Sequence, residues 1–251
     1  MTTMKTELFQ TPVHPSQGLF SVMEDKINAL GFDGVLYSFY PKPMYMNQNI
    51  QPVLQHSGSF TPFIGRYVEK NYGNRDFVLR MALQGRTDPV DWWQEIEQGN
   101  VSPEEQEVTQ DARDNFGIQN GLSIPVLYGT FAIAGISVIS SESDKAKFQA
   151  LKAQSLDSLC DIATNYHSEV IKSTKELHFF ILPLLESLND TKRKVLKHLV
   201  SGQPMKTIED IHGVKQRYAE KVLLDIRKEF GGITANELIY ILGMINILEY
   251  L

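Results

Sequence analysis

The chain has 251 residues, of which 42% are hydrophobic and 22% charged, which is typical of a soluble globular protein and too apolar for intrinsic disorder. Its apolar runs are shorter than the roughly 18 residues of a membrane span, and the first 20 residues lack the pattern of a secretory signal, so no membrane association is expected. The single cysteine, Cys160, excludes an internal disulfide and favours a reducing cytoplasm.

The charge is unevenly distributed. The net charge is −6, but residues 187–251 carry 10 Lys and Arg against 8 Asp and Glu, a net of +2, which leaves −8 on residues 1–186. A modestly basic end on an acidic body is compatible with a DNA-binding module at the C-terminal end.

The N-terminal part predicts helices and strands in alternation. Apolar residues at helical spacing predict a helix over 17–30, which Gly31 ends. Residues 35–40 are typical of a strand, and a second short strand is expected at 52–55. Residues 63–83 are typical of a helix with interruptions.

The central part carries the clearest start signal for a helix. Ser102 is followed by Pro103 and two glutamates, which predicts a helix from there to about Phe116. Residues 122–127 and 131–140 then predict a pair of strands.

A long amphipathic helix is predicted over 144–172. Its apolar stripe consists of Leu151, Leu156, Leu159, Ile162, Ala163 and Tyr166. The stripe is longer than one core contact needs, so this helix is expected to form a homodimer interface; the alternative is that it covers the sheet.

Four short helices are predicted at the C-terminal end, over 188–199, 205–211, 215–230 and 234–248. The second and third are separated by a turn that contains Gly213, which favours a helix-turn-helix fold. The alternative is a helical dimerisation or capping domain.

Enzyme motifs are missing from the sequence. It contains no glycine-rich phosphate loop, no Gly-x-Ser-x-Gly elbow and no paired His or Cys spacing typical of metal ligands. The protein is therefore expected to be no enzyme and to hold no metal or cofactor.

The two halves together resemble the LuxR-type quorum-sensing transcription regulators, over about residues 17–248. The resemblance rests on an ordered set of motifs, namely Gly31-Phe32-Asp33-Gly34, Pro62-Phe63, Tyr67, Tyr72, Asp76, Pro89 with Trp92, Phe116-Gly117-Ile118, Gly121 to Pro125, Gly135-Ile136-Ser137, and the C-terminal skeleton of Leu188, Val195-Leu196, Gly202, Ile208, Leu223, Ile226 and Phe230-Gly231.

This resemblance implies a fold and a function. The expected fold is an α/β/α sandwich around an antiparallel sheet over residues 1–172, a linker over 173–184, and an all-α helix-turn-helix domain over 185–251. The expected function is a cytoplasmic, ligand-responsive transcription regulator that binds an acyl-homoserine lactone or a related signal and, as a homodimer, DNA, with RNA polymerase as a further partner. The alternative is a sensor that has lost DNA binding and pairs with another regulator.

The resemblance also assigns ligand-binding residues, namely Tyr37, Phe63, Tyr67, Asp76, Phe77, Trp92 and Ser137. Asp76 is expected to accept the ligand amide N–H; the alternatives are a helix cap or an ion pair with Arg75 or Arg80. Tyr67 and Ser137 are expected to donate to ligand carbonyls and Trp92 to form an apolar wall, although each could equally be a core residue. Gly121 is expected to serve backbone geometry or close packing rather than direct contact with the ligand.

The sequence departs from the family pattern in both halves, and first at the expected ligand site. Phe63 stands where the family has a tryptophan that donates to the lactone, and Ser59 stands where it has a tyrosine, whose volume Phe60 could fill. Either the ligand is not a plain homoserine lactone, or Tyr45, Gln48 or a water replaces the donor.

The C-terminal helices supply the expected DNA contacts, which are Lys215, Gln216, Arg217, Lys221, Arg227 and Lys228. The early residues of the recognition helix are expected to read bases and the later ones phosphates. The alternative is a solvated charged face. Lys192 and Glu209 depart from the family pattern here, so the target sequence does not transfer.

Overall fold

A computed structural model describes residues 17–41, 52–129, 132–186 and 188–244. Chain contacts divide the chain into two compact units, of which the first comprises residues 1–39, 53–128 and 133–177 and the second residues 40–52, 129–132 and 178–251. The first unit contains the sheet and the second is mainly helical.

Within the described residues, five strands form one sheet in the order β2-β1-β5-β4-β3. The strands are β1 (Gly34–Tyr40), β2 (Val53–His56), β3 (Val90–Asp91), β4 (Asn120–Tyr128) and β5 (Ile133–Ser140). β1 pairs with β2, β3 with β4 and β4 with β5, each in antiparallel register. The expected antiparallel sheet is therefore confirmed.

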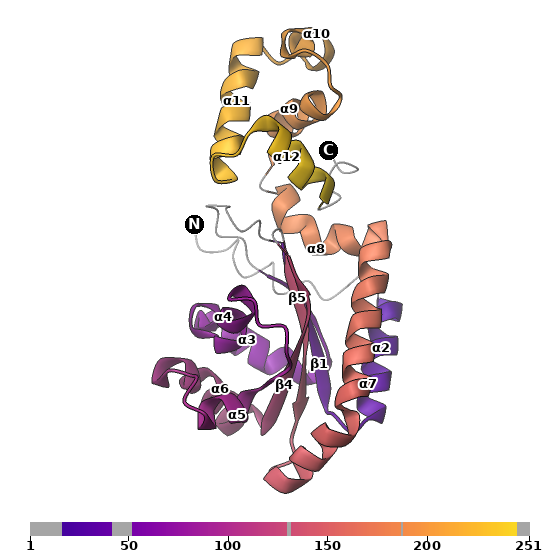
Figure 1. Cartoon of the computed structure of the whole chain (residues 1–251), viewed down its shortest axis with the longest axis vertical. Coiled ribbons are helices and arrows are strands. Elements are labelled where there is room, and N and C mark those ends of the chain that lie inside the picture. The colour runs from indigo at the N-terminus through magenta and orange to yellow at the C-terminus, as the bar shows by residue number, and fades with distance from the viewer. Residues whose placement is uncertain (1–16, 42–51, 130–131, 187, 245–251) are drawn as a thin grey trace. The chain divides into compact units, whose positions relative to one another are not determined.

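Helices cover both faces of this sheet, as the expected α/β/α sandwich requires (Figure 1). One face carries α2 (Gln17–Ala29) and α7 (Lys145–Lys172). The other carries α3 (Thr61–Glu69), α4 (Phe77–Leu83), α5 (Trp92–Glu97) and α6 (Pro103–Phe116). Because both faces are covered, both sets of alternating strand residues can be apolar.

Local signals explain where these helices begin. Ser102 and Glu105 form a capping box at the start of α6, in which each side chain accepts a backbone N–H at the other residue. Asp144 caps α7 by accepting the N–H groups of Ala146 and Lys147. Both starts were predicted from the sequence.

The stripe on α7 is largely covered by the chain's own first unit. Leu159, Ala163 and Tyr166 are buried, as are Phe148 and Val170, and α7 contacts α2, β4 and β5. The interpretation of the stripe as a cover for the sheet is confirmed for these residues, while Leu151, Leu156 and Ile162 are partly exposed. The predicted homodimer remains a prediction.

The predicted interruptions in residues 63–83 are present, because these residues divide into α3, a 3-10 turn over Tyr72–Arg75 and α4. β3 with α5 follows where no element was predicted. The expected linker over 173–184 is largely helical, because α8 spans Thr174–Glu186.

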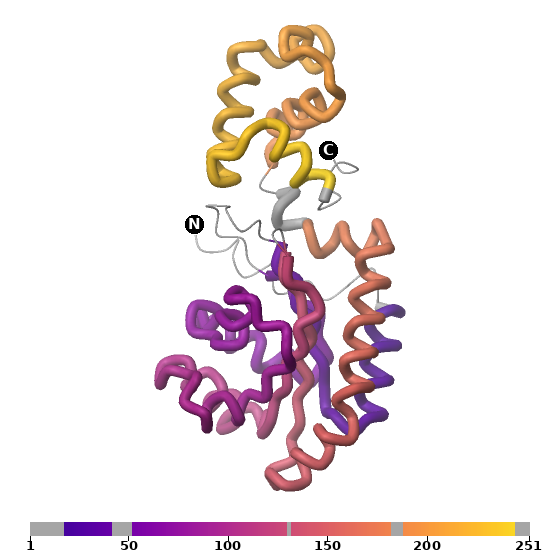
Figure 2. Tube along the Cα trace, viewed as in Figure 1, coloured from indigo at the N-terminus to yellow at the C-terminus, as the bar shows by residue number. Residues whose placement is uncertain are grey.

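The second unit contains the predicted C-terminal helices, which Figure 2 traces. They are α9 (Asp190–Val200), a 3-10 turn over Met205–Thr207, α10 (Ile208–His212), α11 (Gln216–Glu229) and α12 (Ala235–Met244). The buried apolar residues of this unit include Leu188, Val195, Leu196, Ile208, Ala219, Val222, Ile226, Phe230, Leu238 and Leu242. In neither unit does a described helix combine the length and apolarity needed to cross a membrane.

Candidate functional site

The sheet face under α3–α6 carries one buried apolar cluster that gathers several of the predicted ligand-binding residues. Phe63, Phe77 and Trp92 belong to it, and Tyr67 packs against it. Phe63 and Tyr67 are four residues apart on α3, so they lie on one face of the helix, and their ring centroids are 6.1 Å apart. Phe60, which was expected to fill the volume of the missing tyrosine, is also buried in this cluster.

Asp76 lies beside this cluster and makes three hydrogen bonds. Its Oδ1 accepts the N–H groups of Val78 at 2.8 Å and Leu79 at 3.2 Å, so the carboxylate caps α4. Its Oδ2 accepts the Tyr67 hydroxyl at 2.7 Å. Burial raises the pKa of Asp76, against the lowering effect of these hydrogen bonds. Burial and the neighbouring Asp76 also raise the pKa of Tyr67 well above its ordinary value.

The alternatives for Asp76 can now be separated. The helix cap is confirmed. The ion pairs with Arg75 and Arg80 are wrong, because Arg75 pairs with Glu107 and Arg80 with Glu105. A cap that also holds a tyrosine hydroxyl does not exclude a ligand, so the ligand role stays a prediction.

Trp92 begins α5 and lies flat against β4. A β-carbon at Gly121 would overlap the Trp92 ring, so the expectation that Gly121 serves close packing is confirmed. The Trp92 indole N–H donates to Ser123 Oγ at 2.9 Å, and Ser123 Oγ lies 2.7 Å from Ser137 Oγ on β5. Ser123 was not predicted as a site residue; it lies two residues after Gly121 in β4 and therefore on the same face.

Tyr37 is not brought together with the other predicted residues. Its hydroxyl is hydrogen-bonded to His167 Nδ1 of α7 at 2.8 Å, and its ring lies edge-on against Tyr166, with centroids 4.9 Å apart. Its neighbour Leu36 packs against the aromatic cluster instead. Because successive strand residues point to opposite faces, Tyr37 lies under α7, and its assignment to the ligand site is corrected.

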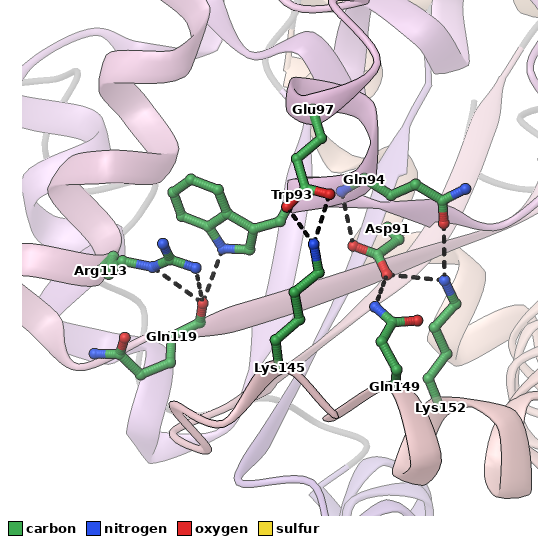
Figure 3. Close-up of polar contacts among 9 residues, drawn as sticks. All are labelled: Asp91, Trp93, Gln94, Glu97, Arg113, Gln119, Lys145, Gln149 and Lys152. Carbon is green, nitrogen blue, oxygen red and sulfur yellow. Dashed lines mark hydrogen bonds and ion pairs between the residues drawn. The ribbon is translucent and has the colours of Figure 1, made fainter. Parts of the chain in front are cut away.

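A buried ion pair between Asp91, the last residue of β3, and Lys152 connects the start of α5 to α7 (Figure 3). Asp91 is 4% exposed, and its Oδ2 accepts from Lys152 Nζ at 2.8 Å and Gln149 Nε2 at 3.1 Å. Its Oδ1 accepts the Gln94 N–H and so caps α5. Burial raises the pKa of Asp91, but the hydrogen bonds from Lys152, Gln149 and Gln94 outweigh this effect and hold the pKa below its ordinary value.

A second polar group in Figure 3 fixes the neighbouring Trp93. Its indole N–H donates to the carbonyl oxygen of Gln119 at 2.8 Å, which also accepts from Arg113. The Arg113 guanidinium lies 3.2 Å from the centre of the Trp93 ring. Trp93 is therefore held by the scaffold, and Trp92 alone of the pair faces the cluster.

Phe63 lacks the hydrogen-bond donor of the family's tryptophan, and the structure does not describe the two side chains that were expected to replace it. Tyr45 and Gln48 lie outside the described residues. Ser59 lies against Gly34 and β1. Among the described residues, the hydroxyls of Tyr67, Ser123 and Ser137 are the donors near the cluster that the polar contacts above identify.

In the second unit, Gly213 separates α10 from α11 with φ of 68°, a left-handed conformation that favours glycine. The expected DNA-contacting residues Lys215, Gln216, Arg217, Lys221 and Lys228 are exposed at and along α11.

Arg227 differs from the other expected DNA contacts. It is partly buried, and its Nε donates to the Ile233 carbonyl at 2.7 Å, so it holds the segment after α11 rather than lying on the exposed face. Lys192, which departs from the family pattern, donates to both Glu229 oxygens at 2.8 Å and ties α9 to α11. Both side chains therefore have a structural role in this unit.

Comparison with known families now decides the nature of the first unit. The autoinducer-binding domain family matches residues 16–166, more than half of the chain. The chain belongs to this family. Its autoinducer-binding domain contains all seven residues that were predicted to bind a ligand, whereas α9–α12 lie beyond the match. No curated protein matches the chain.

Several solved structures are similar to this autoinducer-binding protein. Escherichia coli SdiA has 15% identity and a TM-score of 0.46, covering 96% of this chain and 94% of its own. The N-acylhomoserine lactone dependent LuxR-family transcription factor CepR2 from Burkholderia cenocepacia has 20% identity and a TM-score of 0.42, covering 57% and 79%. The ligand-binding domain of Pseudomonas aeruginosa VqsR has 14% identity and a TM-score of 0.40, covering 64% and 93%. All three TM-scores are below 0.5.

Proposed function

We propose that this protein is a ligand-responsive DNA-binding transcription regulator that senses an acyl-homoserine lactone or a related diffusible signal, as in quorum sensing. The observation that carries the proposal is the Tyr67–Asp76 pair beside the aromatic cluster of an autoinducer-binding domain. A carboxylate and a phenol bordering an apolar cluster suit an amphiphile that has one amide and one acyl chain. The proposal includes no catalytic role.

The polar groups suit an acyl amide in detail. An ionised carboxylate offers about four acceptor sites, and the described donors to Asp76 occupy three, so one further N–H can be accepted. A ligand amide N–H would take this place as a charge-assisted hydrogen bond. Ser137 then provides a hydroxyl proton for a carbonyl oxygen, while Phe63, Phe77 and Trp92 contact the apolar part of the signal. Tyr67, whose one hydroxyl proton is donated to Asp76, holds the carboxylate in place.

Phe63 sets a limit on the headgroup. A phenyl ring has no donor, so the end of the site that it occupies binds a polar ring less strongly than an indole would, by about 0.5–1.5 kcal/mol. The proposal therefore favours a signal whose affinity comes mainly from its amide and acyl chain, and extends to amphiphiles without a lactone.

The second unit is proposed to be the DNA-binding helix-turn-helix. α10, the Gly213 turn and α11 have the order that this motif requires, and α11 exposes Gln216, Arg217 and Lys221 at its start. We assign the early residues to base edges and Lys228 to a phosphate. Because operators read by such motifs are usually two-fold symmetric, the proposal includes a homodimer. It places the protein in the cytoplasm, with RNA polymerase as a further partner.

Selection of DNA from a random library, with and without N-acyl-homoserine lactones, tests this proposal. We expect one sequence family to be enriched by the full chain and its enrichment to depend on the lactone. The double variant Arg217→Ala/Lys221→Ala should bind the enriched sequence more weakly because contacts to base edges are lost. The affinity of Lys228→Ala should depend less on salt because one phosphate fewer is neutralised. Lys26→Ala, which removes an exposed charge from α2, is the control.

The outcomes separate the proposal from its rival. If no DNA is enriched but the lactone binds, the protein is a sensor without DNA binding that acts through another regulator. If DNA binds equally with and without every lactone supplied, signal control by this class is contradicted.

A further inference from the structure

Trp92, Ser123 and Ser137 form a short chain of hydrogen bonds on the ligand-facing side of the sheet. The indole N–H and Ser123 Oγ are 2.9 Å apart, and the two serine oxygens are 2.7 Å apart. Ser123 and Ser137 are directly paired residues of β4 and β5, so the backbone register holds their side chains together. Ile139, two residues after Ser137 on the same face, lies in the aromatic cluster.

The donor and the acceptor of each hydrogen bond in this row follow from counting the available protons. An indole N–H can only donate, so Ser123 Oγ is its acceptor. One hydroxyl proton makes the bond between the two serines, and the other has no partner among the described residues. Ser123 is 4% exposed, whereas Ser137 is partly exposed. If Ser137 donated, the buried Ser123 would keep an unpaired O–H; if Ser123 donates, the unpaired proton lies on Ser137, where another molecule can reach it.

We propose that Trp92 and Ser123 are positioning residues that aim the hydroxyl proton of Ser137 at a carbonyl oxygen of the signal. The inference rests on the proposed function and deepens it, because it assigns how the site orients its hydroxyl donor toward the acyl oxygen of the signal. Each bond in the chain polarises the next, so the Ser137 hydroxyl becomes a stronger donor than an isolated serine. The site therefore selects a signal with a good oxygen acceptor at this point.

Four variants distinguish this relay, the row of hydrogen bonds from Trp92 through Ser123 to Ser137, from ordinary packing. Ser137→Ala removes the donor. Ser123→Ala breaks the relay, and Ser123→Thr restores its hydroxyl. Trp92→Phe keeps an aromatic ring but removes the N–H that sets the direction. Ser155→Ala is the matched control, because it removes a buried hydroxyl of the same size from α7, where Ser155 Oγ donates to the Leu151 carbonyl.

The measurement is the affinity of the full chain for an N-acyl-homoserine lactone and for its thioamide, in which the acyl oxygen is replaced by sulfur, a weaker acceptor. The acyl length is the one that the wild-type protein binds best in a series from butanoyl to dodecanoyl. Wild type and Ser155→Ala should prefer the oxygen compound by roughly three- to tenfold. Ser137→Ala, Ser123→Ala and Trp92→Phe should lose this preference, and Ser123→Thr should regain it.

The preference, rather than the affinity alone, is decisive, because a packing defect weakens both ligands equally. If Ser123→Ala and Trp92→Phe keep the wild-type preference while Ser137→Ala loses it, the relay is wrong. If Ser137→Ala also keeps it, this hydroxyl does not contact the carbonyl. If the wild-type protein binds no lactone in the series, the proposed ligand class itself fails, and the inference fails with it.

Discussion

Replacing Asp76 by asparagine separates the two roles of this carboxylate. As a cap, Asp76 accepts two backbone N–H groups at the start of α4 and the Tyr67 hydroxyl. Asparagine has the same shape, caps helices about as well as aspartate and presents its amide nitrogen to Tyr67, whose hydroxyl can accept instead of donate. We therefore expect the free energy of unfolding without ligand to change by less than about 1 kcal/mol.

The effect on ligand binding should be larger. A ligand amide N–H that meets a carboxylate makes a charge-assisted hydrogen bond, roughly twice as strong as a neutral one. Its loss should cost about 1.5–3 kcal/mol, or one to two decades in Kd. Because burial raises the pKa of Asp76, wild-type affinity should also decline as the pH falls through this raised pKa, whereas the asparagine variant has no such titration.

Isothermal titration with an N-acyl-homoserine lactone, together with thermal unfolding of the ligand-free protein, measures both effects. Asp76→Ala is the comparison, because it removes the cap as well and should cost about 1 kcal/mol of stability. A Kd for Asp76→Asn equal to that of wild type would show that the carboxylate only caps α4. If the ligand-free Asp76→Asn protein unfolded at the same temperature as Asp76→Ala, the capping argument would be refuted.

Three further predictions concern the scaffold around the site. Gly121→Ala should force the Trp92 ring away from β4 and destabilise the protein by about 1–3 kcal/mol in chemical denaturation; an unchanged midpoint would contradict the close packing. Burial lowers the pKa of His167 to about 4 in the folded protein. Between about pH 6.5 and about pH 4 the unfolded chain therefore binds a proton that the folded protein does not, and wild-type stability should fall as the pH drops through this range. The fall is at most about 3 kcal/mol and less for this partly exposed ring, and His167→Asn should flatten the curve; parallel pH profiles would count against this explanation. Lys152→Met leaves the carboxylate of Asp91 buried without its cation and should cost about 3 kcal/mol at neutral pH. The cost should shrink as the pH falls, because Lys152 no longer lowers the pKa of Asp91 and the buried carboxyl of the variant takes up a proton at higher pH than that of wild type; equal denaturation midpoints at pH 7 would disprove the ion pair's role.

Local signals were sufficient for most of the elements. The capping box at Ser102 and the Asp144 cap are short-range features, so the starts of α6 and α7 could be predicted. The helix that spans most of the expected linker over 173–184 was not predicted, because Pro183 argues locally against a helix there. Tertiary context decided that segment.

The face on which a residue lies was harder to predict. β1 is apolar on both sides because helices cover both faces of the sheet, so its pattern could not show that Tyr37 points to α7 and Leu36 to the cluster. In α11, charge alone did not distinguish Arg227, which holds the Ile233 carbonyl, from the exposed Arg217.

Pairings between distant residues could not be predicted from one sequence. Asp91 and Lys152 are 61 positions apart, and the chain from Trp92 through Ser123 to Ser137 depends on the register of β4 and β5. Only the ordered set of motifs indicated that Phe63 and Tyr67 lie near Asp76 and Trp92, because no local rule brings these three segments together.

Photo-crosslinking tests the central claim, that a small amphiphilic signal binds at this face of the autoinducer-binding domain, most directly. The full chain would be irradiated with an acyl-homoserine lactone that carries a diazirine in its acyl chain, and the labelled peptides identified by mass spectrometry. We expect labelling of the segments that contain Phe63, Phe77 and Trp92, competed by the unmodified lactone and reduced in Asp76→Asn. Labelling confined to other segments, or labelling that the unmodified lactone does not reduce, would contradict the claim.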